Sequence, residues 1–175
     1  MAKVEVLRTY LEMTERGALV VAESPDPRAR VERVHDCTAS FFRYLYAEVG
    51  RGYHWVDRLA WSDEVVRARI ASPAVTLHLL SVAGAPAGYF ELERHPDDSV
   101  EIAYFGLLPE FLGRGLGKHL LSRATEEAWA LGPKRVWLHT CTLDDAAALP
   151  NYLARGFRAF KTETYETELE RGPAG

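Results

Sequence analysis

Three glycines alternate at Gly113, Gly115 and Gly117, and this short segment constrains the fold more than any other part of the chain. An apolar, strand-like run leads into it, and a strongly helical run follows it. A side-chain-poor turn at a helix N-terminus can direct several backbone N–H groups at one anion, and the helix dipole adds favourable positive potential there. The segment therefore predicts a strand, a turn and a helix that together bind a phosphate or pyrophosphate group.

Hydrophobic periodicity on both sides of the turn predicts a protein of the α/β (α+β) class. Strands are expected over residues 3–13, 75–82, 88–93, 100–107, 135–139 and 157–166. Helical patterning dominates between the first strand and about residue 71, and further helices are expected over residues 115–131 and 144–155. Hairpin turns at residues 84–86 and 96–98 join the middle strands, so we expect a mixed, mostly antiparallel sheet flanked by helices.

The composition narrows the class of partner. The net charge of -4 gives no support for nucleic acid as a partner, since that role usually needs a basic face. No apolar run reaches the ~18 residues of a membrane span, and the first residues lack the apolar core of a signal peptide. Two cysteines and six scattered histidines show no disulfide framework and no metal-ligand spacing. We therefore expect a cytoplasmic protein without a metal or a membrane partner.

Three kinds of phosphate-binding turn compete for the glycine segment. A Walker A loop needs Ser or Thr after its lysine, whereas His119 follows Lys118 here. A dinucleotide fingerprint needs a third glycine where Lys118 stands, and it needs an acidic residue about 20 residues further on, where this chain has Arg135 and Val136. The third kind has the pattern Gln/Arg-x-x-Gly-x-Gly/Ala, follows a strand and opens a long helix. The segment is expected to have both neighbours, and its glycines at 115 and 117 fit this pattern.

Two blocks of the sequence closely resemble motifs of the GCN5-related N-acetyltransferase (GNAT) family. Residues 101–118 (EIAYFGLLPEFLGRGLGK) resemble its acetyl-CoA-binding motif, and residues 145–157 (DAAALPNYLARGF) resemble its closing motif. The resemblance covers residues 75–166 and implies one GNAT domain over residues 1–175. Within it we expect an N-terminal strand and acceptor-side helices over 3–73, central strands and the cofactor-binding turn and helix over 74–132, and a strand, helix and strand over 133–169.

The resemblance implies that acetyl-CoA is the co-substrate. By analogy, the backbone of Phe105, Gly106 and Leu107 binds the pantetheine arm. The expected pyrophosphate cradle consists of Leu112, Gly113, Arg114, Gly115, Leu116, Gly117 and Lys118, and Asp145 stands at a further cofactor-binding position. The chain departs from the family at Leu112, where Gln or Arg is usual, at Asp145, where Asn is usual, and at Asn151, where Leu is more common.

The resemblance also implies direct transfer of an acetyl group to an amine, which needs a base and an acid. A free alkylammonium has a pKa of ~10 and is no nucleophile until it loses a proton. Glu101 is the leading candidate base, with Glu91 and Glu93 on the neighbouring strand as rivals that could act through a water. Tyr152 stands where the family's general-acid tyrosine lies, and its phenol could protonate the departing sulfur.

Several residues near these motifs carry weaker signals. His139 lies on an expected strand that runs close to the expected thioester, and Cys141 follows that strand. We interpret both as structural residues, Cys141 rather than as a nucleophile and His139 rather than as a substrate-orienting group. An aromatic cluster in the N-terminal half shapes either the acceptor pocket or the core, and it comprises Tyr53, His54, Trp55 and Trp61.

The expected activity is acetylation of a primary amine, with a small-molecule acceptor as the first choice. A protein N-terminus, a protein lysine and a longer acyl-CoA remain open, and a homodimer is compatible with the family. The alternatives from other classes are a non-catalytic acyl-CoA-binding or sensing module and, less strongly, a nucleotide-binding protein, because a fold does not specify its ligand.

Overall fold

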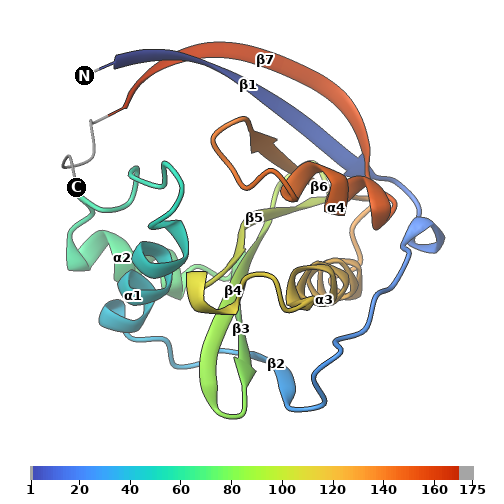
Figure 1. Cartoon of the computed structure of the whole chain (residues 1–175). Coiled ribbons are helices and arrows are strands. Elements are labelled where there is room, and N and C mark those ends of the chain that lie inside the picture. The colour runs from blue at the N-terminus through green and yellow to red at the C-terminus, as the bar shows by residue number, and fades with distance from the viewer. Residues whose placement is uncertain (1, 170–175) are drawn as a thin grey trace.

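A computed structural model describes residues 2–169 and contains a seven-stranded sheet between two groups of helices (Figure 1). The strands are β1 (Ala2–Met13), β2 (Ala29–Arg33), β3 (Val75–Val82), β4 (Ala85–Arg94), β5 (Ser99–Leu107), β6 (Arg135–Cys141) and β7 (Arg158–Leu169). The α-helices are α1 (Ala39–Gly50), α2 (Asp63–Ala71), α3 (Leu116–Ala130) and α4 (Ala148–Ala154). Short 3-10 turns are η1 (Arg16–Ala18) and η2 (Pro109–Phe111). The expected fold class, a mostly antiparallel sheet flanked by helices, is confirmed.

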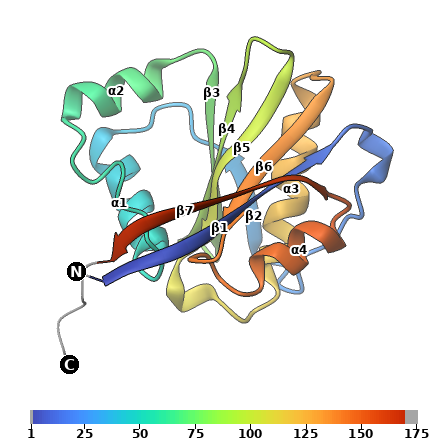
Figure 2. The ribbon, with the colours of Figure 1, turned by 90° about the horizontal axis from the view of Figure 1, so that it is seen from above.

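The sheet runs in the order β2-β3-β4-β5-β6-β1-β7. All neighbouring strands are antiparallel except β5 and β6, which pair in parallel over only three residues each, Ser99–Glu101 with Arg135–Trp137. β1 therefore lies between β6 and β7, although it is the first strand of the chain. Seen from above, β1 and β7 lie side by side and pass in front of the other strands (Figure 2).

Each face of the sheet is covered by helices that pack an apolar stripe against it. On α3 the stripe includes Leu120, Leu121, Ala124 and Ala128, all of which are fully buried against the central strands. On the opposite face, α1 buries apolar side chains that form a second, smaller core with β3 and β4. Within residues 2–169, no helix is both long enough and apolar enough to cross a membrane.

The first two helices begin at side-chain caps. The Thr38 hydroxyl accepts a hydrogen bond from the Phe41 N–H at 3.2 Å, and the Ser62 hydroxyl accepts one from the Val65 N–H at 3.3 Å. Helix α1 ends at Gly50, where an added Cβ would clash with the Trp55 side chain. This close approach brings the aromatic segment after α1 down onto the sheet.

Two sequence predictions were wrong at element boundaries. Residues 29–33 form strand β2 rather than helix, because Ala29 and Val31 alternate with exposed charged residues and pair with one edge of β3. The last helix begins at Ala148 rather than Asp144, because the Asp145 carboxylate accepts the Ala147 N–H at 2.8 Å and fixes a turn there. Pro150 then lies in the first turn of α4, where its missing N–H costs nothing.

The other boundaries differ by a few residues. The first hairpin turns at Ala83 and Gly84, which both have positive φ (51° and 84°), and not at residues 84–86. β6 extends to Cys141 and β7 to Leu169. The C-terminal polar residues 170–175, which the domain prediction includes, lie outside the described residues.

Candidate active site

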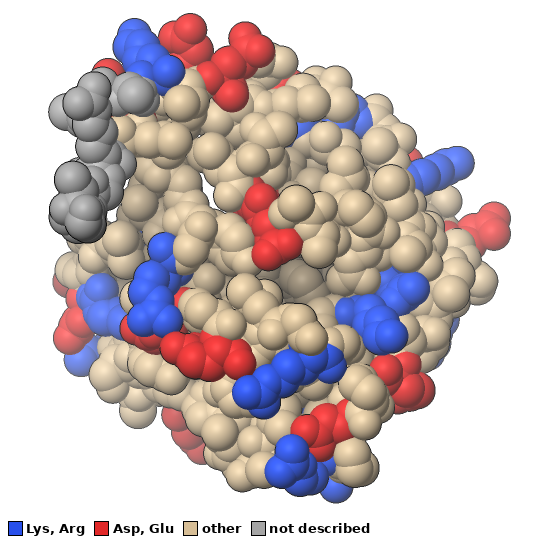
Figure 3. Space-filling model, viewed as in Figure 1, with Lys and Arg blue, Asp and Glu red and all other residues tan. Residues whose placement is uncertain are grey.

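A cavity of about 940 Å³ lies where β5 and β6 separate. Their pairing ends at Glu101 and Trp137, so from Ile102 onward the edge of β5 that faces β6 has no strand partner. Such an edge presents unpaired backbone N–H and C=O groups to whatever enters the gap. The space-filling view shows this hollow near the centre of one face, with acidic side chains on its upper rim (Figure 3).

The glycine turn forms one end of this cavity. Gly113 and Gly115 adopt left-handed backbone conformations with φ of 74° and 73°, a region that a residue with a Cβ rarely enters. Gly115 is the N-cap of α3 and supplies no side-chain acceptor, so no cap covers the amides of the first helical turn. An anion at this position would meet unscreened N–H groups at the positive end of the helix dipole.

The predicted cradle residues fall on two sides of the turn. Six of them line the cavity, namely Leu112, Gly113, Gly115, Leu116, Gly117 and Lys118. Arg114 does not, since its guanidinium carbon lies 4.8 Å from the centre of the Phe111 ring and the side chain borders a separate, smaller hollow. The Leu112 side chain is 43% exposed, so it leaves room beside the turn.

Helix α4 is attached to the first turn of α3 through Asn151. Its side-chain amide donates to the Gly117 carbonyl oxygen at 3.3 Å, and an added Cβ at Gly117 would lie 4.0 Å from that amide nitrogen. The family more often has leucine at this position, so the hydrogen bond is a feature of this chain. It holds Tyr152, the next residue, beside the cavity.

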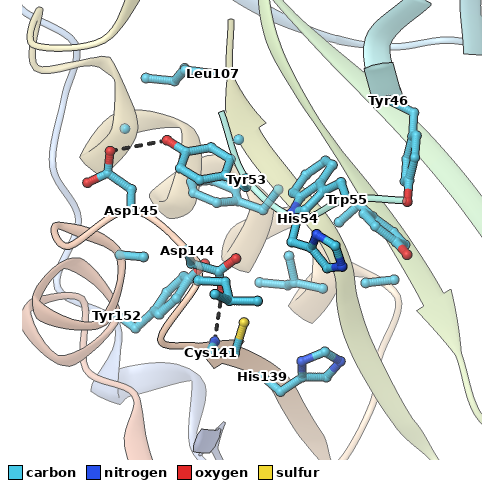
Figure 4. Close-up of a pocket in the computed structure, with 18 of the residues that line it drawn as sticks. Tyr46, Tyr53, His54, Trp55, Leu107, His139, Cys141, Asp144, Asp145 and Tyr152 are labelled. Atoms are coloured by element: carbon cyan, nitrogen blue, oxygen red, sulfur yellow. Dashed lines mark hydrogen bonds between the residues drawn. The ribbon is translucent and has the colours of Figure 1, made fainter. Parts of the chain in front are cut away.

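The central part of the cavity contains the predicted pantetheine-binding residues. Phe105, Gly106 and Leu107 all line it, on the unpaired edge of β5. Asp145 lies on the opposite wall, where its carboxylate accepts a hydrogen bond from the Tyr53 hydroxyl at 3.1 Å (Figure 4). Burial and the nearby carboxylate raise the pKa of Tyr53 to about 12, so this phenol keeps its proton at neutral pH.

Tyr152 is buried on α4 and faces the same space. Its ring meets the edges of Phe105 and Phe157, and in the close-up it lies beside Asp144 (Figure 4). Burial, with a smaller contribution from the Asp144 carboxylate, raises the pKa of Tyr152. The phenol is therefore protonated at neutral pH, as a general acid must be.

Glu101 and Glu93 occupy opposite positions on β5 and β4, and both line the cavity. Burial raises the pKa of Glu101, although a hydrogen bond that its carboxylate accepts from His95 Nε2 at 2.9 Å partly opposes the shift. The hydrogen bond from the Arg69 guanidinium, at 2.8 Å, lowers the pKa of Glu93. Two neighbouring carboxyl groups thus differ in basicity, and Glu101 is the stronger base.

Glu91, the other rival base, has a different environment. Its side chain is completely buried, does not line the cavity, and accepts hydrogen bonds from both Arg58 and Arg69. The Arg58 guanidinium also lies 4.0 Å from the centre of the Tyr104 ring and 4.8 Å from that of Trp61. This buried ion-pair cluster fixes the segment after α1 against the sheet, so we interpret Glu91 as structural.

A β-bulge places Glu101 in the cavity. Tyr104 pairs with Glu91, but Ile102 pairs with Leu92, so Ala103 is an extra residue on β5. Without the bulge, strict alternation would put Glu101 and Tyr104 on opposite faces of the sheet. With it, both side chains line the same wall.

The sequence reasoning did not identify Arg8, Arg58, Arg69 and His95 as site residues. The three arginines lie far along the chain from the motifs and reach the site only through tertiary contacts, whereas His95 lies six residues before Glu101 in a turn that matches no motif. Of the weaker candidates, Cys141, His139, Tyr53, His54, Trp55 and Trp61 all line the cavity. Burial and the nearby Arg8 lower the pKa of His139.

The side chains of Glu93, His95 and Glu101 bring ligand atoms within 4.8 Å of one another, which is close enough for a metal ion. Arg69 already binds Glu93, and His95 already binds Glu101. Each carboxylate is thus hydrogen-bonded within the protein, and a metal ion would have to displace these partners. The absence of a metal stays a prediction.

Comparison with known proteins gives one consistent result. The chain matches the Acetyltransferase (GNAT) family over residues 34–157, which is more than half of its length. A GCN5-related N-acetyltransferase from Kribbella flavida has a TM-score of 0.67 and 23% identity, over 94% of this chain and 58% of that chain. Another, from Sphaerobacter thermophilus, has a TM-score of 0.71 and 15% identity, over 95% of this chain and 53% of that chain.

A shorter solved structure is also similar. An aminoglycoside acetyltransferase from an uncultured soil metagenomic sample has a TM-score of 0.60 and 14% identity, over 74% of this chain and 89% of that chain. These likenesses show the shared fold. The chain spans little more than half the length of the first two proteins. No curated protein matches the sequence.

Proposed function

This chain belongs to the GNAT family of acetyltransferases, and we propose from that membership that it moves an acetyl group from acetyl-CoA to a primary amine of a small molecule. The observation that carries the proposal is the cavity itself, which is lined by the glycine turn, the free edge of β5 and the Glu101 carboxylate. It thus joins an anion-binding helix terminus to a buried base. Proximity of this kind is what a direct transfer requires.

The residues present fit acetyl-CoA. The uncapped amides from Gly113 to Lys118 suit a pyrophosphate, and the unpaired backbone of Phe105 to Leu107 suits the amides of a pantetheine arm. Lys118 adds a cation at the phosphate end. When bound, acetyl-CoA would supply an activated acetyl thioester.

We assign the proton transfers to two residues. Glu101 takes a proton from the acceptor ammonium, and its raised pKa brings its basicity closer to that of the amine. His95 lies next to Glu101 and is 30% exposed, so it offers the proton a path to solvent. Tyr152 gives its phenolic proton to the departing sulfur.

Replacement of Tyr152 tests the acid. Tyr152→Phe should lower kcat by about 10²-fold, because the thiolate then leaves without a proton donor. The Kd for CoA should change by less than about threefold, because the ring and its packing remain. Steady-state kinetics and calorimetry would measure both values, with Tyr44→Phe, an exposed tyrosine outside the cavity, as the control. An unchanged kcat would remove Tyr152 from the mechanism.

Placing arginine, one of the two residues usual in the family, at position 112 should strengthen CoA binding. Leu112 borders the turn and is largely exposed, so Leu112→Arg can reach a pyrophosphate without disturbing the core. We expect a decrease in the Kd of roughly five- to tenfold that weakens with added salt. Leu153→Arg, at an exposed leucine outside the cavity, is the matched control. Equal effects of the two changes would contradict a pyrophosphate at the turn.

The proposed function is tested by following free-thiol release from acetyl-CoA with a panel of small amines, peptides with free N-termini and peptidyl lysines. Turnover of small amines supports the proposal, whereas turnover of peptides alone would support a protein acceptor. Binding of acetyl-CoA without turnover of any acceptor would favour a non-catalytic binding module. Calorimetric preference for ATP or NAD over CoA would overturn the acetyl-CoA site. Separately, a cytoplasmic setting and a homodimer stay predictions.

A further inference from the structure

Four cationic side chains line the cavity, and within residues 2–169 two of them form ion pairs. Arg58 binds Glu91, and Arg69 binds both Glu91 and Glu93. Lys118 belongs to the proposed phosphate end. The remaining cation is Arg8, on β1, whose charge has no carboxylate within ion-pair distance in the described part of the chain.

Among residues 2–169, Arg8 has no counter-ion because its neighbour on β7 is already engaged. Its partner in register on β7 is Glu163. The Glu163 carboxylate instead binds Lys161 at 2.5 Å and accepts a hydrogen bond from the Tyr10 hydroxyl at 2.9 Å. The guanidinium carbon of Arg8 lies 4.8 Å from the centre of the Tyr165 ring, and its Nε is buried with no hydrogen-bond partner among the described residues. A buried donor without an acceptor is unfavourable, which points to a ligand that completes it.

Arg8 and Glu101 project from the same face of the sheet. Arg8 is opposite Cys141 on β6, and Glu101 is beside Trp137 on the same strand. Because these two β6 residues are four apart, they share a face, and their Cα atoms are separated by roughly 13 Å. Both side chains line the same cavity, so one small molecule can contact both charged ends.

His139 lies on β6 between these two positions, on the same face, and lines the cavity. Burial and the charge of Arg8 lower the pKa of its imidazole. The ring therefore stays neutral near pH 7 and can donate one hydrogen bond without repelling a cationic amine. The cavity thus offers a cation and a neutral donor on one side, and carboxylates on the other.

We propose that the acceptor is a small amino-carboxylate, with its carboxylate bound by the Arg8 guanidinium and its amine directed at Glu101. This inference rests on the proposed function and adds the chemical class of the acceptor. A guanidinium can bind a carboxylate through two parallel hydrogen bonds, so it fixes orientation as well as affinity. An amine without a carboxylate would leave the Arg8 charge uncompensated and would bind more weakly.

The experiment compares amino acids with their carboxamides as acceptors, and includes ω-amino acids of increasing length. In the wild type, kcat/KM for the acid should exceed that for the matched amide by about 30-fold or more. Arg8→Gln should reduce this ratio to near one by lowering the value for the acid. Since both acceptors are measured on the same variant, a general folding defect lowers both and cannot change the ratio. Arg8→Lys should restore part of the preference, and Arg67→Gln, on the exposed face of α2, should leave it unchanged.

Two outcomes would overturn the inference while the proposed function stands. These are equal use of acids and amides by the wild type, and an unchanged ratio in Arg8→Gln. If no amine of either kind is turned over, the proposed function itself fails. Calorimetry with the same amino acids then decides the carboxylate site, because binding that Arg8→Gln abolishes supports it and the absence of binding overturns it.

Discussion

Replacing Glu101 with glutamine is expected to lower kcat by about 10²- to 10⁴-fold, the usual contribution of a general base. The amide keeps the shape of the side chain and its hydrogen-bonding contact with His95, but it cannot accept a proton from an ammonium. Binding of CoA should be unaffected, because Glu101 lies apart from the glycine turn along β5. Steady-state kinetics with the preferred amine, alongside calorimetry with CoA, would measure both effects.

The neighbouring carboxylate provides the matched control. Glu93 lies opposite Glu101 and lines the same cavity, but its carboxylate is held by Arg69. Glu93→Gln should therefore lower kcat by less than about tenfold. The reverse order of the two effects would assign the base to Glu93.

The pH profile of the wild type should also identify the base. If Glu101 is the base, as we propose, activity requires its carboxylate form and falls as the pH drops through the pKa of this group. Because burial raises that pKa, the acidic limb should lie above the ordinary value of 4.5. The limb should disappear in Glu101→Gln, and a limb that persists there would belong to another group.

The second large effect is expected on stability, at Gly156 between α4 and β7. This residue has a φ of 103°, and an added Cβ would overlap the Ala18 carbonyl oxygen of η1. Backbone atoms cannot move aside as a flexible side chain can, so Gly156→Ala must displace η1 or β7. We expect the free energy of unfolding to fall by about 3 kcal/mol or more, measured by urea denaturation.

Gly132, which follows α3, is the control that separates the cost of backbone strain from the cost of the overlap with Ala18. Its φ of 76° is also positive, but no heavy atom lies within 4 Å of an added Cβ. Gly132→Ala should therefore cost only the backbone strain, about 1 to 2 kcal/mol. Equal losses at the two sites would show that the contact with Ala18 contributes nothing.

Much of the fold could be predicted because its strands and helices carry strong periodic patterns. β3 was predicted with its full bounds, since Val75 to Val82 is a continuous run of strand-forming residues. β2 was missed because it is an edge strand, where only Ala29 and Val31 need to be apolar. The pairing of β1 with β6 and β7 leaves no signal in the sequence, because register between distant segments is decided only when they pack.

The candidate site also contains residues that could be predicted from the sequence and residues that could not. The glycine turn, the β5 edge and Tyr152 were named in advance, because each belongs to a contiguous motif, and the structure brings them to one cavity. Arg58, Arg69 and Arg8 were not, because their importance depends on which carboxylates they meet. Arg58 matters through Glu91, and Arg8 matters because Glu163 is engaged elsewhere. Such charge partnerships follow from tertiary structure, which a single sequence does not reveal.

The position of β1 has a consequence for how the molecule assembles. Within the described residues β1 precedes every other element, yet both of its strand neighbours, β6 and β7, are the last two strands in chain order. The early segment must therefore wait with its hydrogen-bonding groups unpaired, and closing so long a loop slows folding. Pulse-labelled hydrogen exchange during refolding should show the amides of β1 and β7 gaining protection together, after those of β3, β4 and α3. The wall of the cavity that carries Arg8 would then be the last part of the cavity to form.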